Sequence, residues 1–115
     1  MNIDEQTGKK IQELQILEQN LQNLLMQKQT FQIDLNEVAG ALSDLKKSDD
    51  EVYKIVGGLM IRSDKTSLTS DLEEKKRILE LRISSMEKQE KILDEKAEKF
   101  KKELSDFVSN IKKQE

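Results

Sequence analysis

The segment EVYKIVGGLMIR, residues 51–62, separates two long stretches that each carry a seven-residue apolar repeat. It contains two short runs rich in β-branched residues, with Gly57 and Gly58 between them. Two adjacent glycines supply the positive φ angles that a two-residue hairpin turn requires. The segment therefore predicts a β-hairpin over residues 51–63.

The expected pairing places apolar side chains on both faces of this hairpin. Val56 would pair with Leu59 and Ile55 with Met60, while successive residues along each strand alternate between the faces. A lone hairpin is marginally stable, and its two free edges can pair with strands of other chains. We therefore expect an assembly element. The residues assigned to it are Val52, Tyr53, Ile55, Val56, Gly57, Gly58, Leu59, Met60 and Ile61.

The stretch before the hairpin follows a heptad repeat in which Lys28 is the exception among apolar residues. Since the chain has no proline, a helix can extend over about residues 5–47. Positions a are Leu14, Leu21, Lys28, Leu35 and Leu42, and positions d are Leu17, Leu24, Phe31, Val38 and Leu45.

The stretch after the hairpin predicts a second helix over about residues 66–113. The segment 70–73, SDLE, matches a capping box, although Leu68 on the apolar side also allows an earlier start. Positions d are Leu72, Leu79, Met86, Leu93, Phe100 and Phe107, and positions a are Lys76, Ile83, Glu90, Ala97, Leu104 and Ile111.

Two long helices joined by a short connection should pair as an antiparallel coiled coil. A fold centred on Gly57 places Leu35 opposite Leu79, and a slip by one heptad stays open. In both registers Lys28 lies within about one turn of Glu90, which we interpret as an ion pair that fixes register. Gly40 interrupts the first helix and is interpreted as a site of bending or close approach. The fold class is mainly α, with one β-hairpin joining the two helices.

Composition limits the chemistry of this chain. Charged residues make up 37% and aromatic residues 3%, and Pro, Trp, Cys and His do not occur. The commonest general base, the thiol nucleophile and the usual transition-metal ligands are thus missing. Gly8-Lys9 lacks the remainder of a phosphate-binding loop. We expect no enzyme activity, no cofactor and no metal.

Charge and hydropathy bear on partners and location. The formal net charge is −3, with both signs interleaved, so no basic stripe marks a nucleic-acid surface. No stretch approaches the roughly 20 apolar residues of a membrane span, and the first residues do not have the pattern of a signal peptide. The expectation is a cytoplasmic protein that binds neither nucleic acid nor membrane.

The order of helix, Val-Tyr-Lys strand, glycine turn, Ile-Arg strand and helix resembles the beta subunits of archaeal prefoldin, also called GimC. A single hairpin is similar to beta rather than to alpha subunits, which carry two. The resemblance covers nearly the whole chain. It is carried by Gln27-Lys28-Gln29-Thr30, Glu51-Val52-Tyr53-Lys54, Gly57, Leu59-Met60-Ile61-Arg62, Leu72-Glu73-Glu74-Lys75, Leu79-Glu80-Leu81-Arg82 and Glu87-Lys88-Gln89-Glu90.

This resemblance implies a hexamer of two alpha and four beta subunits, with the hairpins forming a β-barrel platform. It also implies that the distal coil tips bind unfolded client proteins without ATP and that clients pass to a group II chaperonin. Two departures from the family pattern are the absence of a Gly/Met/Pro-rich C-terminal tail and the acidic residues 49–51 before the first strand.

The tips implied by the resemblance combine both ends of the chain. The heptad does not account for the apolar residues Ile11, Ile16 and Val108. For the apolar residues at seam positions, packing within the coiled coil is an alternative explanation to client binding. Fraying of terminal turns would leave large side chains partly exposed to clients. The candidate client-binding residues are Ile3, Ile11, Leu14, Leu17, Phe100, Leu104, Phe107, Val108 and Ile111.

A competing function is a structural adaptor or tether that joins partners without holding clients. The hairpin discriminates between the two, because a plain tether does not need a β segment that is apolar on both faces. Further apolar residues off the seams are interpreted as ordinary surface residues or as additional client contacts. These are Leu25, Met26, Ile33, Ile78, Leu81 and Ile92.

Overall fold

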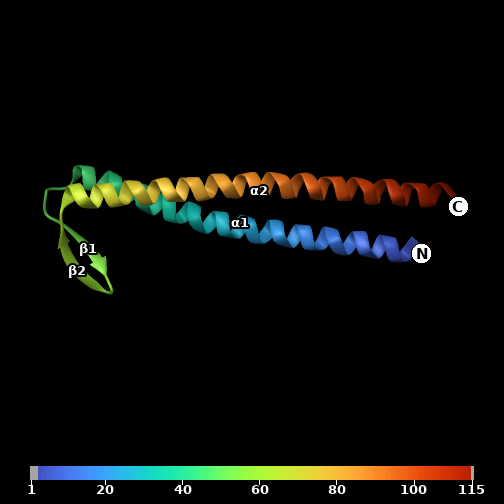
Figure 1. Cartoon of the computed structure of the whole chain (residues 1–115), viewed down its shortest axis with the longest axis horizontal. Helices are drawn as coiled ribbons and strands as arrows, with labels where there is room; N and C mark the ends of the chain where they lie inside the picture. The colour runs from blue at the N-terminus through green and yellow to red at the C-terminus, as the bar shows by residue number, and fades with distance from the viewer. Residues whose placement is uncertain (1–2, 115) are drawn as a thin grey trace. The chain divides into compact units, whose positions relative to one another are not determined.

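The computed structural model describes residues 3–114 of the chain, with side chains described for residues 5–112. Two long helices flank a two-stranded hairpin in chain order, as Figure 1 labels them. This confirms the predicted fold class of the single chain, while the oligomeric β-barrel stays a prediction. The elements are α1 Ile3–Lys47, β1 Val52–Val56, β2 Leu59–Ser63 and α2 Lys65–Gln114.

Contacts divide the chain into two compact units. Unit 1 comprises residues 1–28 and 85–115, and unit 2 comprises residues 29–84. Unit 1 thus holds the N-terminal half of α1 with the C-terminal half of α2. Unit 2 holds the remaining halves of the helices and the hairpin. Organisation as a single domain stays a prediction.

The hairpin of unit 2 has the predicted register. Strands β1 and β2 pair antiparallel, with Val56 opposite Leu59 and Ile55 opposite Met60. The turn glycines have φ angles of 57° at Gly57 and 80° at Gly58. Positive φ at both central residues is the feature of a type I′ turn, whose twist matches that of the flanking strands.

The helix ends next to the hairpin are capped by side chains. The Ser48 hydroxyl donates to the Leu45 carbonyl oxygen over 2.9 Å, and the Lys65 ammonium donates to the Ser48 carbonyl oxygen over 2.9 Å. The first bond satisfies a carbonyl group that the end of α1 leaves without an intrahelical partner, and the second links the first residue of α2 to the residue that follows α1.

The start of α2 at Lys65 agrees with the predicted helix over about residues 66–113, and the possible capping box at residues 70–73 lies inside the helix. Asp64 caps the helix instead: its Oδ2 accepts hydrogen bonds from the Ser67 amide at 3.1 Å and the Ser67 hydroxyl at 2.9 Å. These bonds favour the ionised carboxylate and lower the pKa of Asp64. Asp64 directly follows β2, so the helix begins as soon as the strand ends.

The core of unit 2 lies between the two helices. Buried Val38, Leu42 and Leu79 form a cluster, and Leu35 packs against it. Because Leu79 shares this cluster with both Leu35 and Leu42, the cluster does not decide between the register centred on Gly57 and the one-heptad slip. Phe31 and Leu72 also contact this cluster. The Arg82 guanidinium lies 5.5 Å from the centroid of the Phe31 ring, an arrangement that favours a cation–π attraction.

Unit 1 is an antiparallel helix pair, as its ion pairs show. Lys10 lies 3.6 Å from Glu103, and Lys28 lies 2.9 Å from Glu90, so residue numbers rise on one helix as they fall on the other. The expected proximity of Lys28 and Glu90 is confirmed. Leu24 and Ala97 are the buried apolar residues among the described part of this unit.

The heptad assignment agrees with burial in both units. Every predicted a and d position with a described side chain is buried or half-buried, Lys28, Lys76 and Glu90 included. In contrast, Gly40 is exposed, and a Cβ atom added there would meet no atom within 4 Å. No close approach at Gly40 therefore occurs within the described chain, and the interpretation of a bend or a close approach at the platform stays a prediction.

Candidate functional site

The hairpin of unit 2 exposes most of its apolar side chains. Ile55 is 72% exposed, Leu59 68% and Met60 73%, whereas Val52 is 7% exposed. Because Ile55 and Met60 lie on the face opposite to Leu59, both faces of the hairpin present apolar surface. Tyr53, Val56 and Ile61 are exposed as well. The single chain thus already covers Val52, against its prediction as an assembly residue, but leaves the other apolar side chains of the hairpin exposed.

Unit 1 holds the residues predicted for client binding, with different degrees of exposure. Ile11 and Val108, which the heptad does not explain, are 43% and 44% exposed. Ile3 is the first residue of α1, but its side chain lies outside those that the structure describes. The seam members are half-buried: Leu14, Leu17, Phe100, Leu104, Phe107 and Ile111.

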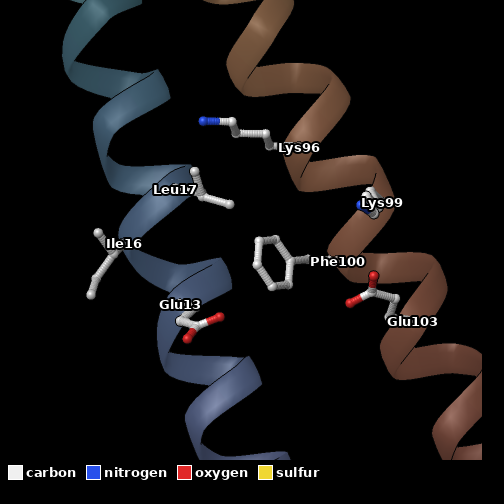
Figure 2. A pocket seen from close by; sticks show the side chains of 7 residues that line it. All are labelled: Glu13, Ile16, Leu17, Lys96, Lys99, Phe100 and Glu103. Carbon is white, nitrogen blue, oxygen red and sulfur yellow. The ribbon is translucent and has the colours of Figure 1, made fainter.

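A groove in unit 1 brings two of these predicted residues together. Its volume is about 510 Å³, and its apolar lining consists of Ile16, Leu17 and Phe100. Figure 2 shows the Phe100 ring projecting from α2 toward α1, with Leu17 on the facing helix. Ile16 is 54% exposed. The helix pair therefore does not close over the Phe100 ring.

Charged side chains frame this groove. Lys96 and Glu13 lie on opposite sides of the Phe100 ring, and Lys99 and Glu103 complete the lining from α2 (Figure 2). Of these, Glu103 is partnered, because its Oε2 lies 3.6 Å from the Lys10 ammonium. Among the described side chains, neither lysine of the groove nor Glu13 has an ion-pair partner within 4 Å.

A second cavity surrounds the ring of Phe107. It is lined by Gln6, Lys9, Lys10 and Glu13 from α1 and by Phe107 from α2. The aromatic ring thus faces the polar side chains and methylene stems of α1 instead of an apolar layer. Continued toward the N-terminus, the heptad of α1 places Thr7 at position a and Lys10 at position d, so this end of the seam lacks apolar residues on α1.

The framing charges were not among the predicted site residues. Glu13, Lys96 and Glu103 each directly precede an a position in the chain and so occupy g positions. Because g residues flank the seam of a coiled coil, their heptad position could have placed them beside Leu17 and Phe100. Interleaved charges occur along both helices, however, and nothing in the pattern singles out these residues.

The described residues contain neither a metal-binding group nor a membrane span. Within residues 3–114, no group of three or more acidic side chains is arranged to hold a metal ion. Neither described helix is long and apolar enough to cross a membrane.

The family of this chain follows from comparison with known proteins. A family model described as "Prefoldin subunit" matches residues 8–110. The chain belongs to the prefoldin subunit family. Prefoldin subunits are chaperones, and membership supports a complex with other subunits. The resemblance that the hairpin and its flanking helices indicated is thus confirmed.

Individual prefoldin relatives match over most of their length. A prefoldin subunit beta of Saccharolobus islandicus is 37% identical over 97 residues, which covers 83% of this chain and 77% of the relative. A prefoldin subunit beta of Methanospirillum hungatei is 35% identical over 113 residues, which covers 96% of this chain and 94% of the relative. The crystal structure of the prefoldin beta subunit from Thermococcus strain KS-1 aligns with a TM-score of 0.83 at 34% identity. The alignment covers 91% of this chain and 94% of that structure's chain.

Proposed function

We propose that this chain is an ATP-independent holdase subunit of a prefoldin complex. It captures non-native polypeptides with the apolar residues of unit 1, prevents their aggregation and delivers them to a group II chaperonin in the cytoplasm. Its hairpin joins further beta subunits and an alpha subunit in a hexamer of two alpha and four beta chains.

The observation that carries the proposal is the apolar surface that unit 1 leaves open. Ile11, Ile16 and Val108 are between 43% and 54% exposed, and the Phe100 ring faces an open groove. Coil packing does not need these residues, since the seam already supplies the contacts between the helices. A partly exposed apolar surface among mixed charges suits weak binding to many unfolded segments.

The hairpin supports the assembly part of the proposal. Both of its faces are apolar and exposed in the single chain, and both of its strand edges are free in the two-stranded sheet. Strands from other subunits would cover these faces and edges. A tether that only joins two partners would not need such an element.

The holdase role is tested by replacing apolar residues in unit 1. The triple variant Phe107→Ser, Val108→Ser and Ile111→Ser should still assemble with an alpha subunit, as native mass spectrometry would show. It should suppress aggregation of a chemically denatured client less well, as measured by light scattering after dilution. A control with Ile33→Ser, Ile78→Ser and Leu81→Ser alters exposed residues of unit 2 instead. Unchanged suppression by the unit 1 variant would refute the assignment.

The assembly role has a separate test. The variant Ile55→Lys with Met60→Lys places two charges on one face of the hairpin, next to each other in the strand register. It should keep its helical circular dichroism but lose the hexamer in native mass spectrometry. Lys54→Gln, an exposed polar change in the same strand, should assemble normally. A hexamer formed by the double lysine variant would contradict the role of this face.

A further inference from the structure

The groove at Phe100 has an unequal balance of charge. Lys96 and Lys99 contribute two positive charges without an ion-pair partner among the described side chains. Glu103 is paired with Lys10, which leaves Glu13 as the carboxylate of the lining without an ion-pair partner among the described side chains. The groove therefore presents an apolar floor with an excess of positive charge at its rim.

Side chains next to the groove carry charges of both signs. Glu13 also lines the adjacent cavity together with Lys9 and Lys10, so its negative charge lies among cations on both sides. Lys101, on the next turn of α2, lies 3.8 Å from Glu18 and 3.7 Å from Glu98, so this cluster outside the groove lining carries one negative charge in excess. The two uncompensated ammonium groups of the groove are those of Lys96 and Lys99.

We propose that this groove selects extended client segments in which a large apolar side chain lies within a few residues of Asp or Glu. The apolar side chain packs on Phe100 and Leu17, while the client carboxylate lies near Lys96 and Lys99. The size of the groove, about 510 Å³, falls in the range of about 300–1,000 Å³ that is typical of sites for small ligands. This inference rests on the proposed holdase function and adds a preference among clients.

The physical basis is complementarity between opposite charges on an exposed surface. A client carboxylate is attracted by the two unpaired ammonium groups, whereas a client lysine at the same place is repelled by them. Such exposed interactions are individually weak and are screened by salt over a distance of about 8 Å at physiological ionic strength. The preference should therefore be modest and strongest at low salt.

The test uses the full chain and three labelled peptides with one shared apolar core, flanked by Glu, by Gln or by Lys. Fluorescence anisotropy at low salt should show the Glu-flanked peptide binding about two- to tenfold more tightly than the Lys-flanked one. High salt should reduce this ratio toward one. This comparison needs no variant and therefore stands even if a substitution disturbs folding.

Variants then assign the effect to the groove. Lys96→Gln with Lys99→Gln should abolish the preference, whereas Lys88→Gln with Lys102→Gln makes the same charge change at exposed lysines elsewhere in unit 1 and should retain it. Equal binding of the Glu- and Lys-flanked peptides would overturn the inference, as would loss of the preference in the control variant.

A parallel light-scattering assay separates this inference from the proposed function. Suppression of client aggregation together with equal peptide affinities overturns the charge preference alone. A complex that neither suppresses aggregation nor binds any of the peptides overturns the holdase function as well.

Discussion

The Nζ atom of Lys28 lies 2.9 Å from Oε2 of Glu90, where each residue occupies a position that the heptad would otherwise fill with an apolar side chain. The two side chains are 28% and 25% exposed, less than those of the other ion pairs in the described chain. The hydrogen bond to Glu90 raises the pKa of Lys28, and the charges of Glu90 and Glu87 act in the same direction. A polar pair at a seam favours one register of the helices over a slipped one.

The first prediction concerns this pair. A double-mutant cycle of Lys28→Gln and Glu90→Gln, followed by urea denaturation, should give a favourable coupling energy. The exposed pair Lys76–Glu80, at 3.9 Å, provides a control cycle with a smaller coupling. Because the pKa of Lys28 is raised above about 10.4, the stabilisation is fully present below that pH and is lost as pH rises through the raised value. A coupling that does not fall at strongly alkaline pH would contradict the prediction.

The second prediction concerns the cap of α2. Asp64→Ala should destabilise the chain because the amide of Ser67 loses its acceptor. Asp64→Asn should keep most of the stability at neutral pH, since asparagine is also a good N-cap. The lowered pKa of Asp64 means that its contribution is present above about 3.9 and is lost as pH falls through the folded value. Thermal unfolding of the three proteins against pH tests this, and an equally acid-sensitive Asn variant would disagree with it.

The third prediction concerns the core of unit 2. Leu79 is 5% exposed and packs with Val38 and Leu42, so Leu79→Ala should lower the free energy of unfolding by about 2–5 kcal/mol. Leu81, on the same helix, is 58% exposed. Leu81→Ala should change stability by no more than about 0.5 kcal/mol. Denaturant titration of both variants measures the contrast, and similar losses would argue against the seam assignment.

The fourth prediction compares one substitution at two glycines. Gly40 lies inside α1 with no atom within 4 Å of an added Cβ, so Gly40→Ala should stabilise by about 0.8–1.0 kcal/mol. Gly57 has a φ of 57°, so Gly57→Ala places an L side chain in the left-handed region and should cost about 1–2 kcal/mol. Melting temperatures should thus shift in opposite directions. A shift in the same direction for both variants would show that backbone conformation does not control the effect.

The fold was predictable from the sequence where a local pattern decides the structure. Gly57 and Gly58 fix the hairpin turn, and the heptad places Leu79 and Val38 at the seam. The start of α2 was predicted to within about one residue, because Leu68 on the apolar side indicated a start before residues 70–73, but the residue that caps the helix was not identified. Asp64, immediately after β2, provides a cap earlier in the chain.

The candidate site was predictable only in part. Phe100 and Leu17 were identified because large apolar residues at the ends of a coil stand out. The charged residues around the groove were not identified, because their influence on a client depends on which of them form ion pairs with each other. Among the described side chains, Lys101 has ion-pair partners and Lys96 has none, and this difference depends on side-chain geometry that the heptad does not encode.

The exposed hairpin has a consequence for the chain before it finds its partners. With Ile55, Leu59 and Met60 uncovered, an unassembled copy displays the sort of surface by which misfolded proteins aggregate. A newly made copy would itself qualify as a substrate for chaperones and proteases. We therefore expect cells to match its synthesis to that of the other subunits, and surplus copies to be short-lived.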